Sequence, residues 1–344
     1  MVSLHKRIAS EASTLGPTNG STRRTQLPML AIPDRNRYNL LCMLGEFVGT
    51  FLFLFFSFAG TQISNTPAPA SGSDPNTSNL LYASLTFGFS LTVNVWAFFR
   101  VTGGLFNPAV TLALCVVGGM PIARGLYVFP AQLLGGIAAA GVVSCLFPGP
   151  LNVTTRLGGG ASISQGLFIE MFLTAQLVFV ITMLAVVKHK STFLAPVGIG
   201  LTFFVCEMSS SYTHLLSPGI YYTGGSLNPA RSLGPDVINR SFPGYHWIYW
   251  VGPLLGSLLA SAFFALLRMV RFEKINPGQD ANEWEASAEA AAKIQSWTSD
   301  QSPSDRIDHG GETYSPNGAN AAQGQTGNQS RAPGITSGTP EQQV

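Results

Sequence analysis

The chain has 344 residues, of which 46% are hydrophobic and 10% are charged, against about 25% charged residues in an ordinary soluble domain. Its net charge of +2 is too small to indicate nucleic acid as a partner. The apolar residues gather in long blocks, which favours membrane spans over one large soluble core. No nucleophile with a matching base, Gly-rich phosphate loop or metal-ligand cluster is visible in the sequence. We therefore expect neither an enzyme nor a bound cofactor or metal ion.

Residues 1–39 are rich in Ser and Thr, and residues 271–344 in Gly, Ser, Gln, Asn and Pro. Both segments predict disordered arms, because such compositions cannot bury a core. An apolar stretch of about 20 residues can cross the hydrocarbon core of a bilayer as a helix. Between the arms, residues 40–270 predict one membrane domain with six such spans, at residues 40–60, 79–99, 124–147, 164–187, 191–211 and 245–267.

Two further apolar segments are too short to cross a membrane. Residues 107–118 and 228–238 would form helices of about 18 Å or less. Each opens with the same tripeptide and is preceded by two glycines and two other residues. A single Asn-Pro-Ala arises by chance, whereas two copies with the same flanks indicate an internal repeat. The copies are Asn107, Pro108 and Ala109, and Asn228, Pro229 and Ala230.

The spans repeat along with these two boxes. A Glu-x-x-x-Thr pattern begins at Glu46 in the first predicted span and at Glu170 in the fourth. The halves, about residues 40–147 and 164–270, each hold three spans and one short helix. Because three is an odd number, the second half enters the membrane from the opposite side. We expect an all-α membrane protein in which six transmembrane helices and two half-helices form an inverted repeat, as in some transport proteins.

Asn-Pro-Ala suits the start of a helix, because Asn is a preferred N-cap and Pro fits the first helical position. The cap uses the side-chain oxygen of Asn and leaves its amide NH2 free to donate. In an inverted repeat the two half-helices meet N-terminus to N-terminus, and their positive dipole ends disfavour cations at the midplane. We therefore expect Asn107 and Asn228 to donate hydrogen bonds to an uncharged molecule in a pore. The alternative is two plain helix caps.

On these motifs the chain resembles the aquaporin, or major intrinsic protein, family over about residues 40–270. Arg231 after the second box and the pair Tyr249-Trp250 in the last span add to the resemblance. The sequence of residues 195–200 is similar to that of filamentous-fungal members. The resemblance implies a passive channel in a lipid bilayer for water or small neutral solutes, assembled as a homotetramer.

Arg231 lies about one turn into the second half-helix, where the first half has Val110. A charged side chain inside a membrane is a candidate functional residue. The alternative is a snorkelling or salt-bridged Arg. By resemblance, Arg231 belongs to the outer selectivity filter, together with Phe87 and Gly225.

The fourth filter position, on the fifth span, remains open. Water-specific relatives usually carry His there, but the connector before the second box is longer here than is typical of the family. Glu207 and His214 are both candidates, and we favour Glu207. A carboxylate at this position could pair with Arg231. The extra residues could also form a lid over the mouth of the pore or be an artefact of the gene model.

Glu46 and Glu170 have two interpretations. In the family, the matching carboxylates hold the backbone of the Asn-Pro-Ala loops by hydrogen bonds, and an irregular loop inside a membrane needs such partners. We therefore predict structural loop anchors. The alternative is a proton relay.

Ser232, where glycerol-conducting relatives typically have Asp, favours a water channel, as does the aromatic pair Tyr249-Trp250. Asp236, Gly225 and the unresolved fourth filter position leave hydrogen peroxide, glycerol or another small neutral solute open. Two other classes compete with a channel. A secondary transporter would need a coupling-ion site, and a membrane scaffold of the same fold would have a closed pore.

Lys and Arg are concentrated in the connectors at one side of the predicted domain, at Arg100, Arg124 and Lys188, and beyond the last span. Positive residues favour the cytosolic side, so we expect both termini in the cytosol, and the plasma membrane as the site. The opposite side then carries two Asn-x-Ser/Thr sequons, at Asn76 and Asn152, as candidate glycosylation sites.

Overall fold

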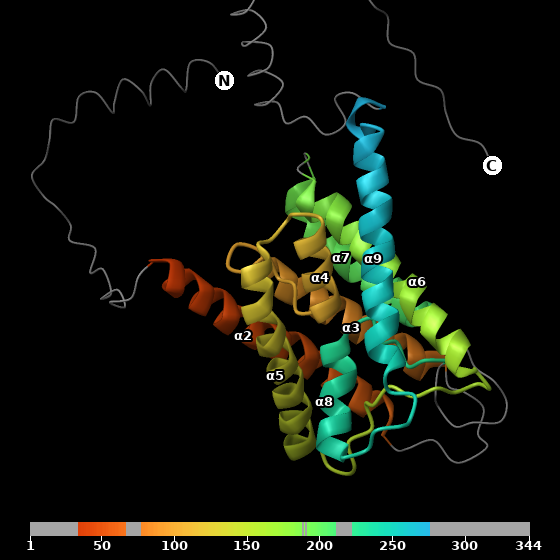
Figure 1. Ribbon diagram of the computed structural model, residues 1–344. Coiled ribbons are helices and arrows are strands. Elements are labelled where there is room, and N and C mark those ends of the chain that lie inside the picture. Colours follow the sequence, from red (N-terminus) through yellow and green to blue (C-terminus); the bar gives the residue numbers. More distant parts are fainter. Residues whose placement is uncertain (1–33, 67–76, 188, 190, 211–221, 276–344) are drawn as a thin grey trace, which may run out of the picture. The chain divides into compact units, whose positions relative to one another are not determined.

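The computed structural model describes residues 34–66, 77–187, 189, 191–210 and 222–275. All of them lie in one of the chain's two compact units, Met1–Ala288. Three short turns of other helix types interrupt or follow the α-helices: a π-helix, Thr182–Val186, and two 3-10 helices, Thr192–Leu194 and Phe272–Lys274. The α-helices (Figure 1) are α2 (Asp34–Ser64), α3 (Thr77–Phe98), α4 (Pro108–Val116), α5 (Ile122–Leu146), α6 (Ile163–Ile181), α7 (Ala195–Ser209), α8 (Pro229–Asn239) and α9 (Ile248–Met269).

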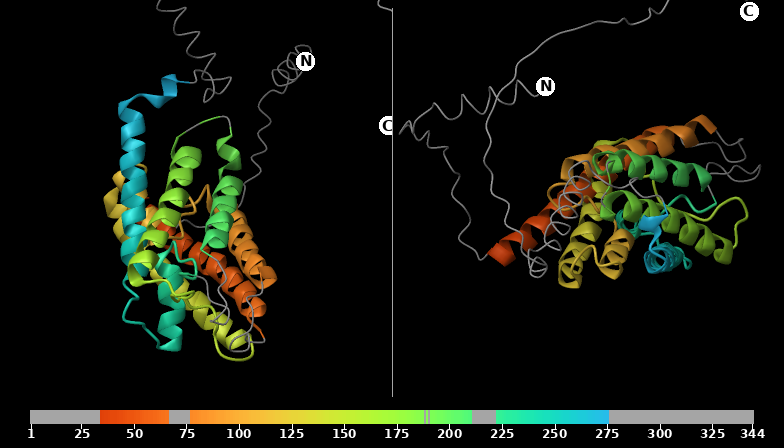
Figure 2. Two further views of the ribbon diagram at one scale, coloured as in Figure 1. Left: turned by 90° about the vertical axis from the view of Figure 1, so that its right-hand side faces the viewer. Right: turned by 90° about the horizontal axis from the view of Figure 1, so that it is seen from above.

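The α-helices pack as two equivalent sets. α2 packs against α3 and α5, and α6 packs in the same way against α7 and α9. The sets are joined where α3 packs against α7. Each short helix packs against the last long helix of the other set, α8 against α5 and α4 against α9 (Figure 2). The two halves therefore interlock around α4 and α8, which extend from the middle toward opposite ends (Figure 1).

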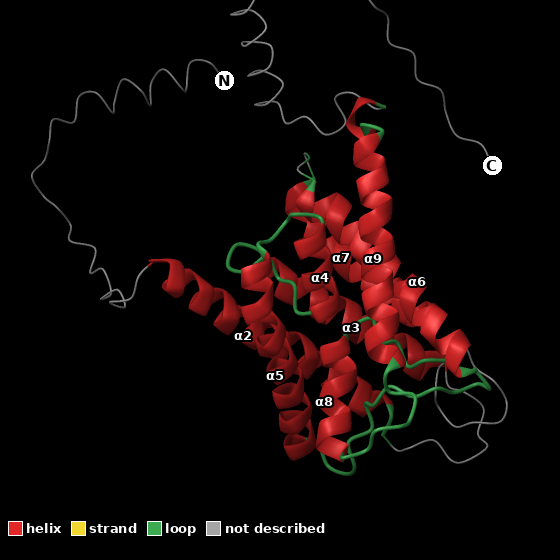
Figure 3. Ribbon diagram, in the orientation of Figure 1, coloured by secondary structure: helices red, strands yellow, loops and turns green. Residues whose placement is uncertain are grey.

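Every regular element of the described residues is a helix (Figure 3). Six of the helical segments are long and apolar enough to cross a membrane. The remaining two α-helices, α4 and α8, have only 9 and 11 residues. The predicted all-α fold, with six spanning helices and two short ones, is confirmed.

Large apolar side chains cover the outward faces of the long helices. More than half of each side chain is exposed at Phe56, Phe89, Leu126, Leu134 and Phe172. Water would make such extensive apolar exposure unfavourable, whereas lipid tails are as apolar as these side chains. Together with the six spans, this makes the chain a multi-pass integral membrane protein.

The helix bounds depart from the predicted spans at both ends of the domain. α2 begins at Asp34, so residues 34–39 of the predicted disordered arm are helical. Similarly, Phe272–Lys274 form a helical turn inside the predicted C-terminal tail. Hydropathy detects only the apolar part of a helix, whereas polar turns at its ends can continue the same backbone hydrogen bonds beyond the hydrocarbon core.

Candidate functional site

The two Asn-Pro-Ala boxes adopt the same backbone conformation. Asn107 caps α4 with φ −151° and ψ 119°, and its Oδ1 accepts from the N–H of Ala109 at 2.9 Å. Asn228 caps α8 with φ −151° and ψ 109°, and its Oδ1 accepts from the N–H of Ala230, also at 2.9 Å. Each box thus starts a short helix, with Pro at the first helical position.

Each Asn also bonds to the loop of the other box. Nδ2 of Asn107 donates to the carbonyl of Leu227 at 2.8 Å, and Nδ2 of Asn228 donates to the carbonyl of Phe106 at 2.9 Å. The expectation that both amide hydrogens are free is therefore wrong for one hydrogen of each Asn, because the buried loop carbonyls of Leu227 and Phe106 need a donor. One N–H per Asn remains for a molecule in the pore.

Two buried carboxylates hold the loops that lead into the boxes. Glu46 accepts from the N–H groups of Leu105 and Phe106 at 3.1 and 2.8 Å. Glu170 accepts from those of Ser226 and Leu227 at 2.9 and 2.8 Å.

The loops need such support. Phe106 and Leu227, each directly before an Asn, have φ of 50° and 49°, a conformation that is strained for any residue with a side chain. The carboxylates thus bond to the backbone at the two residues with a strained conformation.

Sequence reasoning missed two polar residues behind the first box. Gln132 on α5 is fully buried, and its Nε2 donates to Glu46 at 2.9 Å and to Thr111 at 2.9 Å. Ser257 on α9 donates to the carbonyl of Ala109 at 2.7 Å. Both are polar residues in apolar spans, and a polar side chain there demands a partner. Their position as polar residues within apolar spans could have identified them from the sequence.

Arg231 on α8 is the centre of a second cluster, beyond the Asn pair. Its Cζ lies 4.9 Å from the ring centre of Phe87 and 5.5 Å from that of Phe58. Three carbonyls accept from the guanidinium: that of Gly225 from Nε at 3.1 Å, that of Val153 from Nη1 at 2.6 Å, and that of Gly224 from Nη2 at 3.4 Å. The charge is 97% buried but well supplied with acceptors.

Glu207 completes the cluster. Gly225 has φ +56°, and a Cβ built on it would collide with Oε2 of Glu207 and lie 2.9 Å from Oγ of Ser210. Arg231 donates to the carbonyl of the same Gly225 at 3.1 Å, so both side chains lie beside this glycine. The structure therefore brings together Phe87, Glu207, Gly225 and Arg231, the four residues expected at the filter. The alternative candidate, His214, lies outside the described residues.

The segment before α6 supplies part of this cluster, which the sequence did not indicate. Besides the carbonyl of Val153, it provides Thr155, whose Oγ1 donates to Ser232 at 2.9 Å, and Arg156, whose Nη1 lies 2.6 Å from a carboxylate oxygen of Asp236. The other oxygen of Asp236 lies 2.8 Å from Nδ1 of His246. Asp236 was a reason to consider solutes other than water. In the structure its carboxylate bonds to Arg156 and His246, and so it connects this segment to α8.

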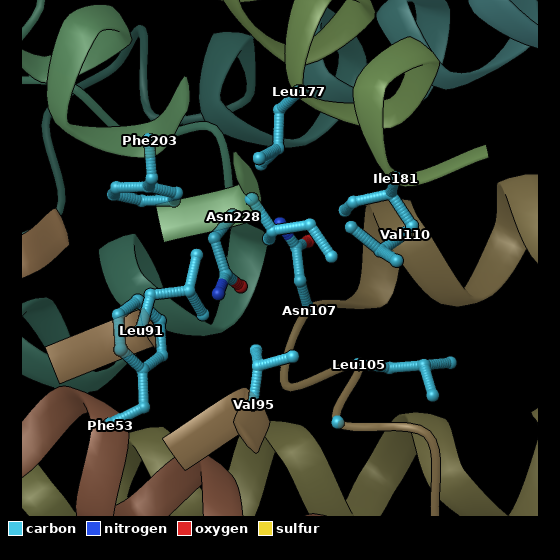
Figure 4. Close-up of a pocket in the computed structure, with 12 residues that line it drawn as sticks. Phe53, Leu91, Val95, Leu105, Asn107, Val110, Leu177, Ile181, Phe203 and Asn228 are labelled. Carbon is cyan, nitrogen blue, oxygen red and sulfur yellow. The ribbon is translucent and has the colours of Figure 1, made fainter. Parts of the chain in front are cut away.

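A small cavity, with about 10 Å³ of room for a water-sized molecule, lies between the two halves. Asn107 and Asn228 provide its polar side chains, while most of the wall is apolar (Figure 4). A small molecule in it would meet two amide donors and little else to bond to. The other lining residues are Phe53, Leu91, Val95, Gly104, Leu105, Val110, Leu177, Ile181, Ile199 and Phe203.

Residues 36–264 match the family model described as "Major intrinsic protein", and the similar proteins include several fungal aquaporins. The chain belongs to the major intrinsic protein, or aquaporin, family. Members of this family are channels for water and small solutes and not enzymes. In the described part of this aquaporin-family chain, no three His, Cys, Asp or Glu residues are grouped as a metal site would require.

The similar aquaporins are mostly longer than the matched region. The chain is 56% identical to aquaporin-7 of Botryotinia fuckeliana, over 73% of this chain and 55% of that protein. It is 51% identical to probable aquaporin-3 of Gibberella zeae, over 71% and 83% respectively. The chain thus spans about half the length of some of its curated relatives.

Among solved structures, the aquaglyceroporin from Plasmodium falciparum matches with a TM-score of 0.55 at 21% identity, over 69% of this chain and 98% of that one. At this identity the match speaks for the fold alone.

Proposed function

We propose that the chain forms a passive channel that conducts water down its gradient and excludes ions and protons. The observation that carries the proposal is the pair Asn107 and Asn228, which face one apolar cavity from two opposed helix N-termini. A water molecule there can accept a hydrogen bond from each free amide N–H, so its own hydrogens point away. The two positive helix ends make the same place unfavourable for a cation.

Arg231 is the proposed charged residue of the filter, and Glu207 is its neighbouring polar residue. The three carbonyls around the guanidinium use three of its five N–H groups, and two remain for a passing molecule. Glu207 is buried beside Gly225 in the same cluster and is proposed as a polar group of the filter. Exclusion of ions then depends on the cost of stripping their water in a narrow apolar passage.

Three contacts favour water over glycerol as the solute. The ring of Phe87 lies against Arg231. Tyr249 is fully buried and donates to the carbonyl of Thr223 at 2.9 Å, which packs a large ring directly behind the filter loop. Ser232 bonds to Thr155 and Ser226, so it contributes to packing and not to a polyol site. Hydrogen peroxide, which is close to water in size, is the second solute to test.

The test is stopped-flow shrinkage of proteoliposomes. We expect wild-type vesicles to shrink much faster than empty ones, with a low activation energy. Asn228→Ala and Arg231→Ala should change flow or selectivity. Asn65→Ala is the matched control, because Asn65 is an Asn whose Nδ2 also donates to a loop carbonyl, that of Asn152, but at the surface. Glycerol uptake and a peroxide-sensing dye in the same vesicles identify the solute.

Other outcomes would support the competing functions. If wild type and a chain lacking residues 1–33 both match empty vesicles, a non-conducting scaffold is the better interpretation. Glycerol uptake as fast as water flow would indicate a polyol channel. Saturable uptake driven by an ion gradient would indicate a secondary transporter.

Location and assembly are proposed on the same basis. Basic residues in connectors such as Arg100 and Arg124 support cytosolic termini. The plasma membrane is the proposed site, and family membership supports a homotetramer. Asn152 is exposed beside the filter segment, which suits glycosylation. Asn76, the other candidate, lies outside the described residues. Glycosylation would appear as a mass shift that a glycosidase removes and that Asn152→Gln reduces. Chemical cross-linking in membranes would give the mass of the oligomer.

A further inference from the structure

Phe203 is a pore residue that no motif indicated. It lies on α7, one helical turn before the filter residue Glu207. Its side chain is 1% exposed and lines the cavity that holds Asn107 and Asn228 (Figure 4). One turn corresponds to about 5 Å along the helix axis. Phe203 therefore lies between the filter and the Asn pair.

Three rings from three helices meet at this level. The ring of Phe203 is stacked on that of Phe87, with centroids 5.8 Å apart and planes at 15°. Phe53 on α2 meets Phe203 edge to face at 5.7 Å and 85°, and meets Phe87 at 6.3 Å and 76°. Contacts of this geometry are favourable beyond the apolar area they bury. The three rings support one another.

Close contact of α3 with α7 restrains the rings further. A Cβ built on Gly200 would collide with Oγ1 of Thr92, and one built on Gly88 would lie 2.6 Å from Cβ of Phe204. The two helices therefore touch backbone to backbone directly beside Phe87 and Phe203. A ring held in this way can turn aside for a large solute only if the helices separate.

The residues that line the cavity differ from those of the filter. Phe53, Leu91 and Phe203 line the cavity, whereas Phe87, Gly225 and Arg231 of the filter do not. Phe53 and Phe203, which both contact Phe87, are therefore the part of the cavity wall that lies next to the filter.

We propose that Phe203, with Phe53, forms a second, apolar constriction between the filter and the Asn pair, and that it sets the upper size of the solute. This rests on the proposed water channel. Water in single file keeps hydrogen bonds to the waters before and behind it. A polyol such as glycerol must lose water from three hydroxyl groups there, and aromatic rings offer those groups no replacement. The constriction rejects polyols while water passes.

The experiment compares glycerol and water flow in proteoliposomes of wild type, Phe203→Val and Phe203→Leu. We expect glycerol permeability to rise by about tenfold or more in Phe203→Val and less in Phe203→Leu, whereas water flow stays near the wild-type value. Phe55→Val is the matched control, since Phe55 is a half-buried ring on α2 that does not line the cavity. If Phe203→Val does not fold, as judged by its elution in detergent, Phe203→Leu and Phe53→Leu carry the test.

Two results would overturn the proposal. One is unchanged glycerol permeability in both Phe203 variants while they still conduct water. The other is an increase in glycerol permeability for Phe87→Val alone, which would assign the size limit to the filter. Failure of the water channel itself is distinguishable, because wild-type vesicles would then shrink no faster than empty ones.

Discussion

Substituting Gln for Glu46 separates the two roles considered for this carboxylate. The side chain is fully buried, and its oxygens accept from two backbone N–H groups and from Gln132. A Gln can accept through only one oxygen, and its amide would face one of the N–H donors. One buried donor then loses its partner, which costs about 1–3 kcal/mol. The other two bonds also weaken, because their acceptor is no longer charged.

Glu46→Ala is the more severe change. It leaves all three donors without an acceptor, a loss of about 3–9 kcal/mol, which is comparable with the total stability of about 5–15 kcal/mol typical of a folded protein. We expect Glu46→Ala not to yield folded protein. Glu46→Gln should fold with a lower midpoint of thermal unfolding in detergent. Glu170→Gln is the matched variant, because Glu170 accepts from the equivalent pair of N–H groups.

Proton flux decides between the roles. For a loop anchor, vesicles under a pH gradient show no proton flow through wild type or Glu46→Gln, and the variant is merely less stable. For a proton relay, wild type conducts protons, and Glu46→Gln abolishes that flow at unchanged stability. The second result, or a variant as stable as wild type, would refute the anchor argument.

Three other changes follow from the contacts. Gly225→Ala adds a Cβ where φ is +56° and Glu207 occupies the space, so we expect slower water flow and a loss of at least about 1 kcal/mol of stability. Arg156→Ala removes one of the two partners of fully buried Asp236, which keeps its contact with His246, and should cost about 1–3 kcal/mol. A double-mutant cycle with Asp236→Asn in thermal unfolding gives the coupling, and additive effects would contradict it. Oγ1 of Thr174 is buried without a hydrogen-bond partner in the described residues. Thr174→Val should therefore stabilise by about 1 kcal/mol, and a lower unfolding midpoint would contradict this.

The fold was predictable because lipid imposes a simple rule. Spans must be long, apolar and helical, and the repeated boxes gave the inverted halves. The helix ends were less predictable. Nothing in the hydropathy at Asp34 separates a polar helical turn from a polar arm, since both are compatible with water. The π-helical turn after Ile181 likewise leaves no mark on the apolar pattern.

The Asn pair was predictable because helix-cap chemistry requires that residue at that position. The positions of Phe87 and Gly225 beside Arg231 came from the family resemblance and not from their own properties. The contribution of Val153 could not be predicted in either way. It acts through a backbone carbonyl, which every residue type has, and it lies in an irregular segment without periodicity.

The residues that repeat between the two halves have a different role from the residues around Arg231. The features that match between the halves, such as Glu46 with Glu170 and the two Asn caps, hold the short helices in place. The counterpart of Arg231 in the first half is Val110. The guanidinium of Arg231 needs carbonyl acceptors, whereas the side chain of Val110 needs none. The segment before α6 provides one of these acceptors, the carbonyl of Val153. Among the described residues, this segment makes no matching hydrogen bond to α4. The symmetric part therefore places the paired half-helices, and the part that breaks the symmetry supplies the proposed filter at one end.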